Sequence, residues 1–167
     1  HCEKNNTHTP IIIAPIPASP IPKSMATPSL LAHIIGNKYQ FALPLYRQET
    51  IFARAGLTIP RSTLAQWVGT CGVRLQPLVD ALKTEILSHR VLHADETPVQ
   101  VLKRGSERDG KTHRAYLWAY TPGRHEQMKA VVYDFCESRA GKHASAFLED
   151  WSGTLLVDDF AGYKQLI

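Results

Sequence analysis

The stretch Arg90-Val-Leu-His-Ala-Asp-Glu-Thr-Pro-Val-Gln-Val-Leu102 decides how the rest of the chain is interpreted. Its aliphatic residues favour a half-buried strand, which two acids, Asp95 and Glu96, interrupt. An unpaired buried carboxylate is costly or takes up a proton, so an acid in such a strand usually has a partner, commonly a metal ion. Side chains alternate along a strand, which puts His93 and Asp95 on one face and Glu96 on the other, where we expect it to pair locally. Pro98 lacks a ladder donor and predicts a strand end or a sheet edge.

Composition limits the class of protein only loosely. The 167 residues carry 19 Lys and Arg against 15 acids, and a formal charge of +4 permits a polyanionic partner without requiring one. Three widely spaced cysteines, Cys2, Cys71 and Cys136, argue against a disulfide framework and suit the cytoplasm. No apolar run approaches the ~20 residues of a membrane span, so we expect no membrane association. The chain opens on His1 and stops at Ile167 inside an apparent helix, so we expect a fragment.

Residues 1–28 are rich in proline and lack hydrophobic periodicity. The segment 16–22 predicts an extended, unpacked linker of the polyproline type. Cys2, His1 and His8 are zinc-ligand types, but a tetrahedral structural site needs four ligands and no Cys-x-x-Cys pair is present. The ligands present in this segment therefore argue against zinc binding by this chain alone.

Residues 29–88 follow a helical pattern. Ser29 is the expected cap of a first helix that ends at Gly36, and Pro44 is expected to open a second helix that closes at Gly56. Two further apolar stripes at helical spacing predict helix up to about residue 88. Their members are Leu64, Trp67, Val68 and Cys71, then Leu75, Leu78, Val79, Leu82 and Ile86.

A proline inside the last of these stripes predicts a break. Pro77 should kink or restart the helix, because a proline in a helix interior costs ~3 kcal/mol.

The helices joined across Gly56-Leu57 have the spacing of a helix-turn-helix. On that hypothesis Arg61, Ser62 and Gln66 would enter a DNA major groove on the second helix. Helix pairs with a glycine turn are common, so a helical scaffold with a merely solvated polar face is an equal alternative.

A charged, glycine-punctuated turn follows the Asp95 strand. Lys103, Arg104 and Lys111 in this turn are candidate contacts to DNA phosphates, although a solvated hairpin tip explains the same pattern.

The second half of the chain predicts an α/β fold. Expected strands at 115–120 and 129–135, a helix at 141–151 and a buried strand at 154–160 are followed by the start of another helix. The first three strands can form hairpins, and a helical crossover permits a parallel fourth strand. A mixed sheet with the first and fourth strands adjacent would bring Asp95 and Asp158 together.

Such a pair of acids has a physical consequence. Two carboxylates ~4 Å apart repel by ~4 kcal/mol at an effective dielectric constant of 20, and a divalent cation relieves that repulsion. Hard oxygen ligands suit Mg²⁺ or Mn²⁺.

The motifs Leu92-His-Ala-Asp-Glu-Thr-Pro98 and Asp158-x-x-Ala-Gly-Tyr163 resemble the catalytic blocks of bacterial transposases of the insertion sequence 66 family. The resemblance runs in order from about Pro15 to Ile167. Upstream segments similar to the family are Ile21-Pro-Lys23, Leu30-Leu-Ala32, Pro44-Leu-Tyr-Arg-Gln-Glu49, Ile51-Phe-Ala-Arg54 and Arg61-Ser-Thr-Leu-Ala-Gln-Trp-Val68.

This resemblance implies a ribonuclease-H-like catalytic core and a triad of two aspartates and one glutamate that binds two metal ions, Mg²⁺ or Mn²⁺. It implies cleavage and strand transfer at transposon ends, DNA as partner, and a homo-oligomeric complete enzyme. Carried onto this chain, the two metal-binding aspartates are Asp95 and Asp158, with Asp159 only a neighbour.

The chain also departs from the family pattern. Of the family's N-terminal zinc-binding cysteines only Cys2 is present, and no acid follows Asp159 to serve as the triad glutamate. We therefore expect a zinc-segment remnant and linker at 1–28, a helical region at 29–88, and the first part of a catalytic domain at 89–167, inactive by itself. Two alternatives are a non-catalytic DNA-binding protein and a metal-dependent nuclease of the same fold that cuts DNA without joining it.

Overall fold

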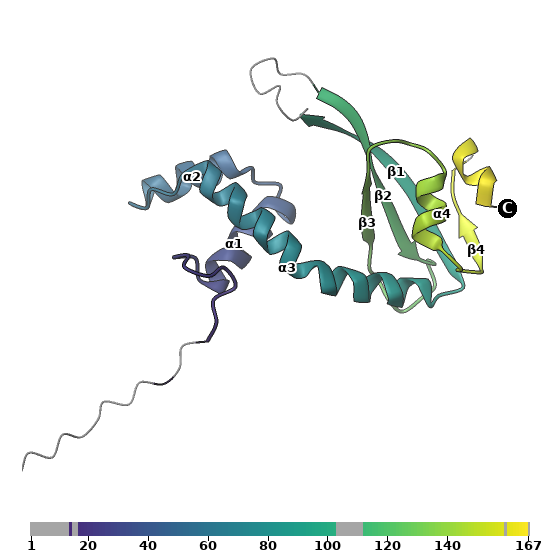
Figure 1. Ribbon diagram of the computed structural model, residues 1–167, viewed down its shortest axis with the longest axis horizontal. Coiled ribbons are helices and arrows are strands. Elements are labelled where there is room, and N and C mark those ends of the chain that lie inside the picture. The colour runs from purple at the N-terminus through teal and green to yellow at the C-terminus, as the bar shows by residue number, and fades with distance from the viewer. Residues whose placement is uncertain (1–13, 15–16, 103–111, 159, 167) are drawn as a thin grey trace, which may run out of the picture. The chain divides into compact units, whose positions relative to one another are not determined.

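The computed structural model describes residues 14, 17–102, 112–158 and 160–166, and it divides into two compact units, His1–Leu75 and Gln76–Ile167 (Figure 1). The α/β class expected from the sequence is confirmed. In chain order the elements are α1 (Pro28–Tyr39), α2 (Leu45–Arg54), α3 (Arg61–Leu87), β1 (Val91–Leu102), β2 (Thr112–Pro122), β3 (Val132–Cys136), α4 (Lys142–Leu148), β4 (Thr154–Leu156) and a 3-10 helix, η1 (Ala161–Leu166). Across the described residues, every helix falls short of the length or the hydrophobicity that a membrane span requires.

The first helix begins earlier and ends later than expected. Thr27, not Ser29, caps α1, because its side-chain oxygen accepts the Leu30 N–H at 3.2 Å. The helix also continues past Gly36, whose carbonyl accepts the N–H groups of Gln40 and Phe41 in the last turn. A glycine inside a helix costs only about 1 kcal/mol, which the packing of α1 can offset.

The second helix begins and ends where the sequence predicts, whereas the third helix differs at Pro77. Pro44 precedes α2, and the chain turns after it at Gly56, where φ is +82° and glycine avoids the strain a side chain would cause. Of the expected kink or restart at Pro77, the restart is wrong, since α3 is one helix from Arg61 to Leu87, and the kink stays a prediction. Pro77 deprives the Val73 carbonyl of its usual donor, but Val73 is 77% exposed and water can replace that donor.

Burial differs from the sequence pattern in two places. Leu75, Leu78 and Val79 of the second stripe are exposed, and of its members only Ile86 is buried. The proline-rich segment is not wholly unpacked, because Ile21 packs against the core of the first unit and Ala26 belongs to it. The buried residues of this core are Ala26, Leu31, Ile34, Phe52, Ile59, Leu64, Trp67 and Cys71.

The second unit is built on a mixed sheet of order β3-β2-β1-β4, with the strand, strand, strand, helix, strand sequence that was expected. β1 is antiparallel to β2 from Leu92 to Leu102, β2 is antiparallel to β3, and β1 is parallel to β4 from Val91 to His93. The predicted adjacency of the first and fourth strands is therefore confirmed. Beyond His93, β1 pairs with β2 alone among the described strands, so Pro98 does lie on a sheet edge, as predicted.

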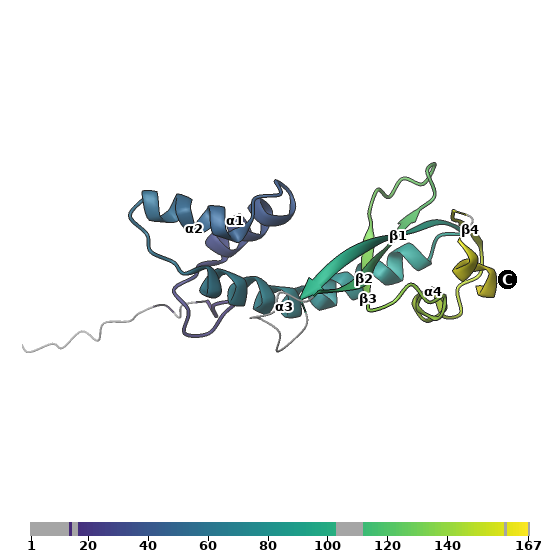
Figure 2. The ribbon, with the colours of Figure 1, turned by 90° about the horizontal axis from the view of Figure 1, so that it is seen from above.

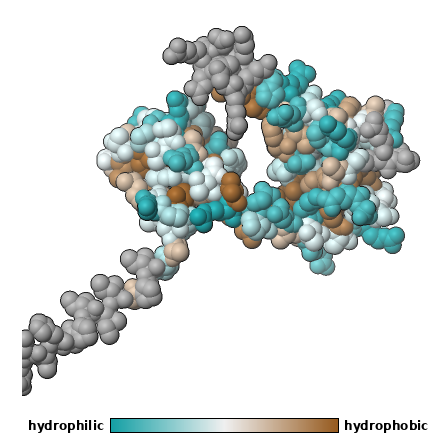
Figure 3. Space-filling view, viewed as in Figure 1, coloured by the Kyte–Doolittle hydropathy of each residue, from teal (hydrophilic) through white to brown (hydrophobic). Residues whose placement is uncertain are grey.

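One face of this sheet carries the core. α4 lies against it (Figures 1 and 2), and the Phe147 ring stacks on the Tyr120 ring with centroids 3.7 Å apart. The core cluster also includes Ile86 of α3 and Trp118 of β2. On the opposite face Tyr133 and Phe135 of β3 are exposed, and hydrophobic residues remain visible on the surface of both units (Figure 3).

The last elements are shorter than the sequence indicated. α4 ends at Leu148, before Trp151, because Glu149 adopts a positive φ of 47°. β4 has three residues, and its ends are exposed, so the expectation of a buried strand is wrong. The helix expected at the end of the chain is the 3-10 helix η1.

Candidate active site

Asp95 lies near the middle of β1 on the open face of the sheet. Burial alternates along this strand as predicted: Leu92, Ala94 and Glu96 are buried, whereas Asp95 is exposed. The Asp95 Oδ1 atom accepts the N–H of Glu96 at 2.9 Å, which orients the carboxylate. The β1–β2 ladder runs on both sides of this position, so the backbone that carries Asp95 is firmly paired.

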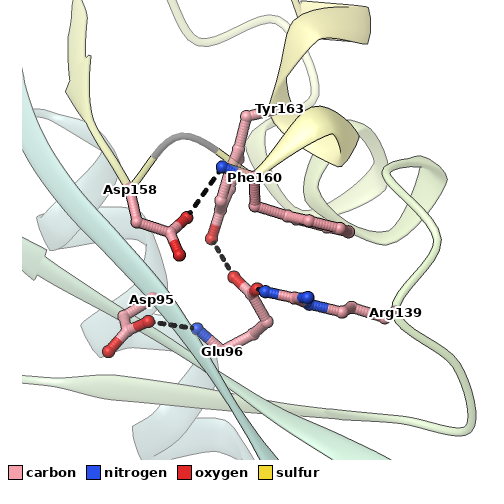
Figure 4. A network of polar contacts seen from close by, with 6 residues as sticks. All are labelled: Asp95, Glu96, Arg139, Asp158, Phe160 and Tyr163. Atoms are coloured by element: carbon pink, nitrogen blue, oxygen red, sulfur yellow. Dashed lines mark hydrogen bonds and ion pairs between the residues drawn. The ribbon is translucent and has the colours of Figure 1, made fainter.

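Asp158 lies two residues beyond the end of β4 and is also exposed. Its Oδ1 atom accepts the N–H of Phe160 at 3.1 Å. Because β4 is the parallel neighbour of β1, Asp158 and Asp95 line one hollow of about 600 Å³, and Figure 4 shows both carboxylates on the same side of the site. The other lining residues are His93, Ala94, Ala119, Thr121, Val131, Tyr133, Leu156 and Val157.

The two carboxylates suit a hard divalent cation. In each of them a backbone N–H holds one oxygen and leaves the carboxylate reachable from solvent. They do not form a complete site by themselves, because the described part of the chain has no group of three or more acids, histidines or cysteines placed to hold a metal. Mg²⁺ is commonly held by one or two carboxylates together with water and substrate phosphates, so the donor set fits this ion.

Glu96 has partners far away in the sequence, and the expectation that it pairs locally is wrong. Its side chain is 0% exposed and lies on the core face. Arg139 donates from Nε at 2.7 Å and also from a terminal guanidinium nitrogen, both to Glu96 Oε1. Tyr163 donates its hydroxyl to Glu96 Oε2 at 2.7 Å (Figure 4). A buried carboxylate needs such donors, since an unpaired one would lose its hydration without compensation.

This network changes the acidity of its donors. The hydrogen bond to Glu96 raises the pKa of Arg139 above its usual value, and Asp158 adds to that effect. Burial raises the pKa of Tyr163, and its hydrogen bond to Glu96 raises the pKa further. Arg139 therefore stays charged and Tyr163 stays a neutral donor, which is the combination that a buried carboxylate requires.

The residues predicted to contact DNA fall into two sets. Arg61, Ser62 and Gln66 are all exposed in the first two turns of α3. The Arg61 N–H donates to Glu49 Oε1 of α2 at 2.8 Å, so Glu49 helps to cap α3. The second set, Lys103, Arg104 and Lys111, lies outside the described residues.

Sequence reasoning missed Arg139 and Tyr163 as partners of Glu96. A signal for a partner existed: once alternation puts Glu96 on the core face, that carboxylate must have buried donors. Which residues supply them could not be read from the pattern, because Arg139 lies in the connection before α4 and Tyr163 in a 3-10 turn.

Comparison with known proteins places the chain in a family. The model of the "Transposase IS66 family" matches residues 23–167. Two uncharacterized proteins of Sinorhizobium fredii, y4qI and y4jD, are each 38% identical over 160 residues, which is 93% of this chain but 29% and 31% of theirs. A third, y4hP, is 28% identical over 156 residues, 91% of this chain and 27% of its own length.

The chain thus spans less than a third of the length of these curated relatives. No solved structure matches it. The match of the family model over most of the chain, with both aspartate motifs inside the matched range, shows that this chain belongs to the IS66 transposase family.

Proposed function

We propose that this chain carries two of the acidic residues of a DNA transposase, Asp95 and Asp158, on a ribonuclease-H-like sheet. The observation that carries the proposal is the hollow that both carboxylates line, Asp95 from β1 and Asp158 from two residues beyond β4, the parallel neighbour of β1. The strand order β3-β2-β1-β4 and the crossover through α4 support the proposed fold.

Asp95 and Asp158 would hold a divalent ion, Mg²⁺ or Mn²⁺, against a phosphate of the DNA backbone. When bound, such ions help to activate the attacking hydroxyl and to stabilise the leaving oxygen in phosphodiester transfer. The part that the chain itself plays is to bring two negative charges together on an open sheet face and to orient each with a backbone N–H. This explains why two acids occupy a hollow where they would otherwise repel each other.

The ion-binding step can be tested on this chain without activity. Mn²⁺ binding is measured by electron paramagnetic resonance in wild type, Asp95→Asn and Asp158→Asn, with Asp150→Asn as the control. Asp150 is an exposed acid in the same unit that does not line the hollow. We expect at least a tenfold loss of affinity in the two site variants and no change in the control; equal binding by all four proteins would refute the proposal.

DNA cleavage and strand transfer belong to the proposal for the complete protein. Among the described residues that line the hollow, Asp95 and Asp158 are the acids, so we expect this chain alone to be inactive or nearly so. Nicking of transposon-end DNA by the purified chain, lost in Asp95→Ala, would contradict this. A full-length relative that cuts DNA but never joins a 3′ end would instead be a nuclease of this fold.

A second candidate function, DNA binding by the helical region, has separate support. Arg61, Ser62 and Gln66 are exposed together at the start of α3. If Arg61 contacts a phosphate, Arg61→Ala should lower the slope of affinity against salt by about one. Fluorescence anisotropy with duplex DNA measures this, and Asp95→Asn should leave the slope unchanged.

A further inference from the structure

The sheet brings the chain to within two residues of Asp158 but does not pair Asp158 itself. The β1–β4 ladder ends at the pair His93 and Leu156, two residues before Asp158. The Asp158 carboxylate itself bonds to the N–H of Phe160 within the same turn. A bond this local shapes the turn but does not fix where the turn lies relative to Asp95.

The Glu96 network reaches this turn from β1. Tyr163, which donates to Glu96, lies five residues after Asp158, and its ring packs edge-on against Trp118 of β2 with centroids 5.6 Å apart. The Arg139 guanidinium, which also donates to Glu96, lies 3.7 Å from the centroid of the Phe160 ring. The buried carboxylate therefore holds both Tyr163 directly and Phe160 through Arg139, as Figure 4 shows.

Stability alone is a weak explanation for these contacts. Replacing a buried ion pair by well-packed apolar side chains is often neutral or stabilising. A polar cluster whose members all have partners instead specifies one arrangement of the segments that it joins. Here these segments are the strand of Asp95, the connection before α4, and the turn that follows Asp158.

We propose that Glu96 is a positioning residue, which through Arg139 and Tyr163 fixes the turn carrying Asp158 beside Asp95. The inference rests on the proposed function, because the arrangement matters only if both aspartates bind one ion. Glu96 itself would not contact the ion, since its carboxylate is enclosed on the opposite, core face of β1.

The test uses Glu96→Gln, which keeps the size of the side chain but removes its charge. Glu126→Gln is the matched control: Glu126 pairs with His89 at 3.2 Å in the same unit and has no described contact with the turn after Asp158. Two quantities are measured in each variant, amide hydrogen exchange by NMR and Mn²⁺ affinity.

In Glu96→Gln we expect the rate of amide hydrogen exchange at residues 158–163 to rise at least tenfold more than the rate in β2. Mn²⁺ affinity should fall by about tenfold, which is typical when a residue that orients metal ligands is removed. Glu126→Gln should change neither quantity. Tyr163→Phe keeps the ring packing and removes one hydrogen bond, so it should fold even where Glu96→Gln does not. It should produce a smaller change in the same direction, about two- to tenfold.

The outcomes separate this inference from the proposed function. If wild type binds Mn²⁺ but Glu96→Gln and Tyr163→Phe bind it equally well, the positioning role is overturned. A rise in exchange spread evenly over the whole sheet would overturn it too, because that indicates general destabilisation. If wild type binds no Mn²⁺ through Asp95 and Asp158, the proposed function fails, while a rise confined to 158–163 still supports the role of Glu96 in fixing this turn.

Discussion

Substituting Gly153 by alanine tests whether β4 lies as close to β1 as the candidate site requires. Gly153 is the residue before β4, and a Cβ atom built on it would lie 2.4 Å from the carbonyl oxygen of Arg90 and 2.5 Å from the Trp151 ring. The Arg90 oxygen also accepts the Thr154 N–H at 2.8 Å, next to the first residue pair of the β1–β4 ladder. Relief of the clash must therefore move backbone and separate the two strands.

The size of the effect follows from these contacts. Overpacking in a well-packed region costs about 1–3 kcal/mol, and a lost hydrogen bond about 0.5–1.5 kcal/mol. We therefore expect Gly153→Ala to lower the free energy of unfolding by about 2 kcal/mol or more. For a unit of this size, each kcal/mol corresponds to about 4–8 °C in Tm, so the decrease should be about 8–16 °C.

Thermal and urea unfolding followed by circular dichroism measure this change. Gly72→Ala is the control, because a Cβ atom at Gly72 of α3 would meet nothing within 4 Å. That variant should be more stable by about 0.5–1 kcal/mol, since glycine disfavours helix. Unchanged stability of Gly153→Ala would refute the close β1–β4 approach, and with it the placement of Asp158 beside Asp95.

Three further results are expected. Phe147→Ala should cost about 3–5 kcal/mol in urea unfolding, because the ring is buried and stacks on Tyr120; a loss below 1 kcal/mol would contradict the packing of α4. Asp95→Asn should leave the ion-free protein as stable as wild type or more stable, because it removes one of two like charges, and a large loss of Tm would instead give Asp95 a structural role. Burial, and then the neighbouring Asp134, raise the pKa of the Cys136 thiol to about 12. An unfolded chain loses this proton near the ordinary value of 9.0, so the free energy of unfolding should fall as pH rises from about 9 to 12. In Cys136→Ala the fall should be less steep.

The order of the strands and the pairing of β1 with β4 could be predicted because both follow from local rules. Alternation fixed the face of Asp95, and a helix between the third and fourth strands predicted the parallel step that brings Asp158 to the same edge. The partners of Glu96 could not be predicted in this way. They depend on tertiary packing of a loop and a 3-10 turn, which have no periodic signal.

The differences in the helical region have a similar cause. A proline disfavours helix, yet α3 continues through Pro77, where the exposure of Val73 allows water to replace the missing donor. The stripe of Leu75, Leu78 and Val79 has helical spacing, but spacing shows only that the side chains share a face. Whether a neighbour covers that face is not a property of the helix sequence.

The shortness of β4 has a consequence for ion preference. Asp95 sits on a backbone held by a long ladder to β2, whereas side chains from distant segments hold the turn of Asp158. Cations differ in radius: oxygen ligands lie at about 2.0–2.1 Å from Mg²⁺ and 2.3–2.6 Å from Ca²⁺. If both aspartates bind one ion, accommodating the larger ion would move the Asp158 side of the pair. The choice between metals would then be tuned through the side chains that bond to Glu96, Arg139 and Tyr163, and not through the β1–β2 ladder.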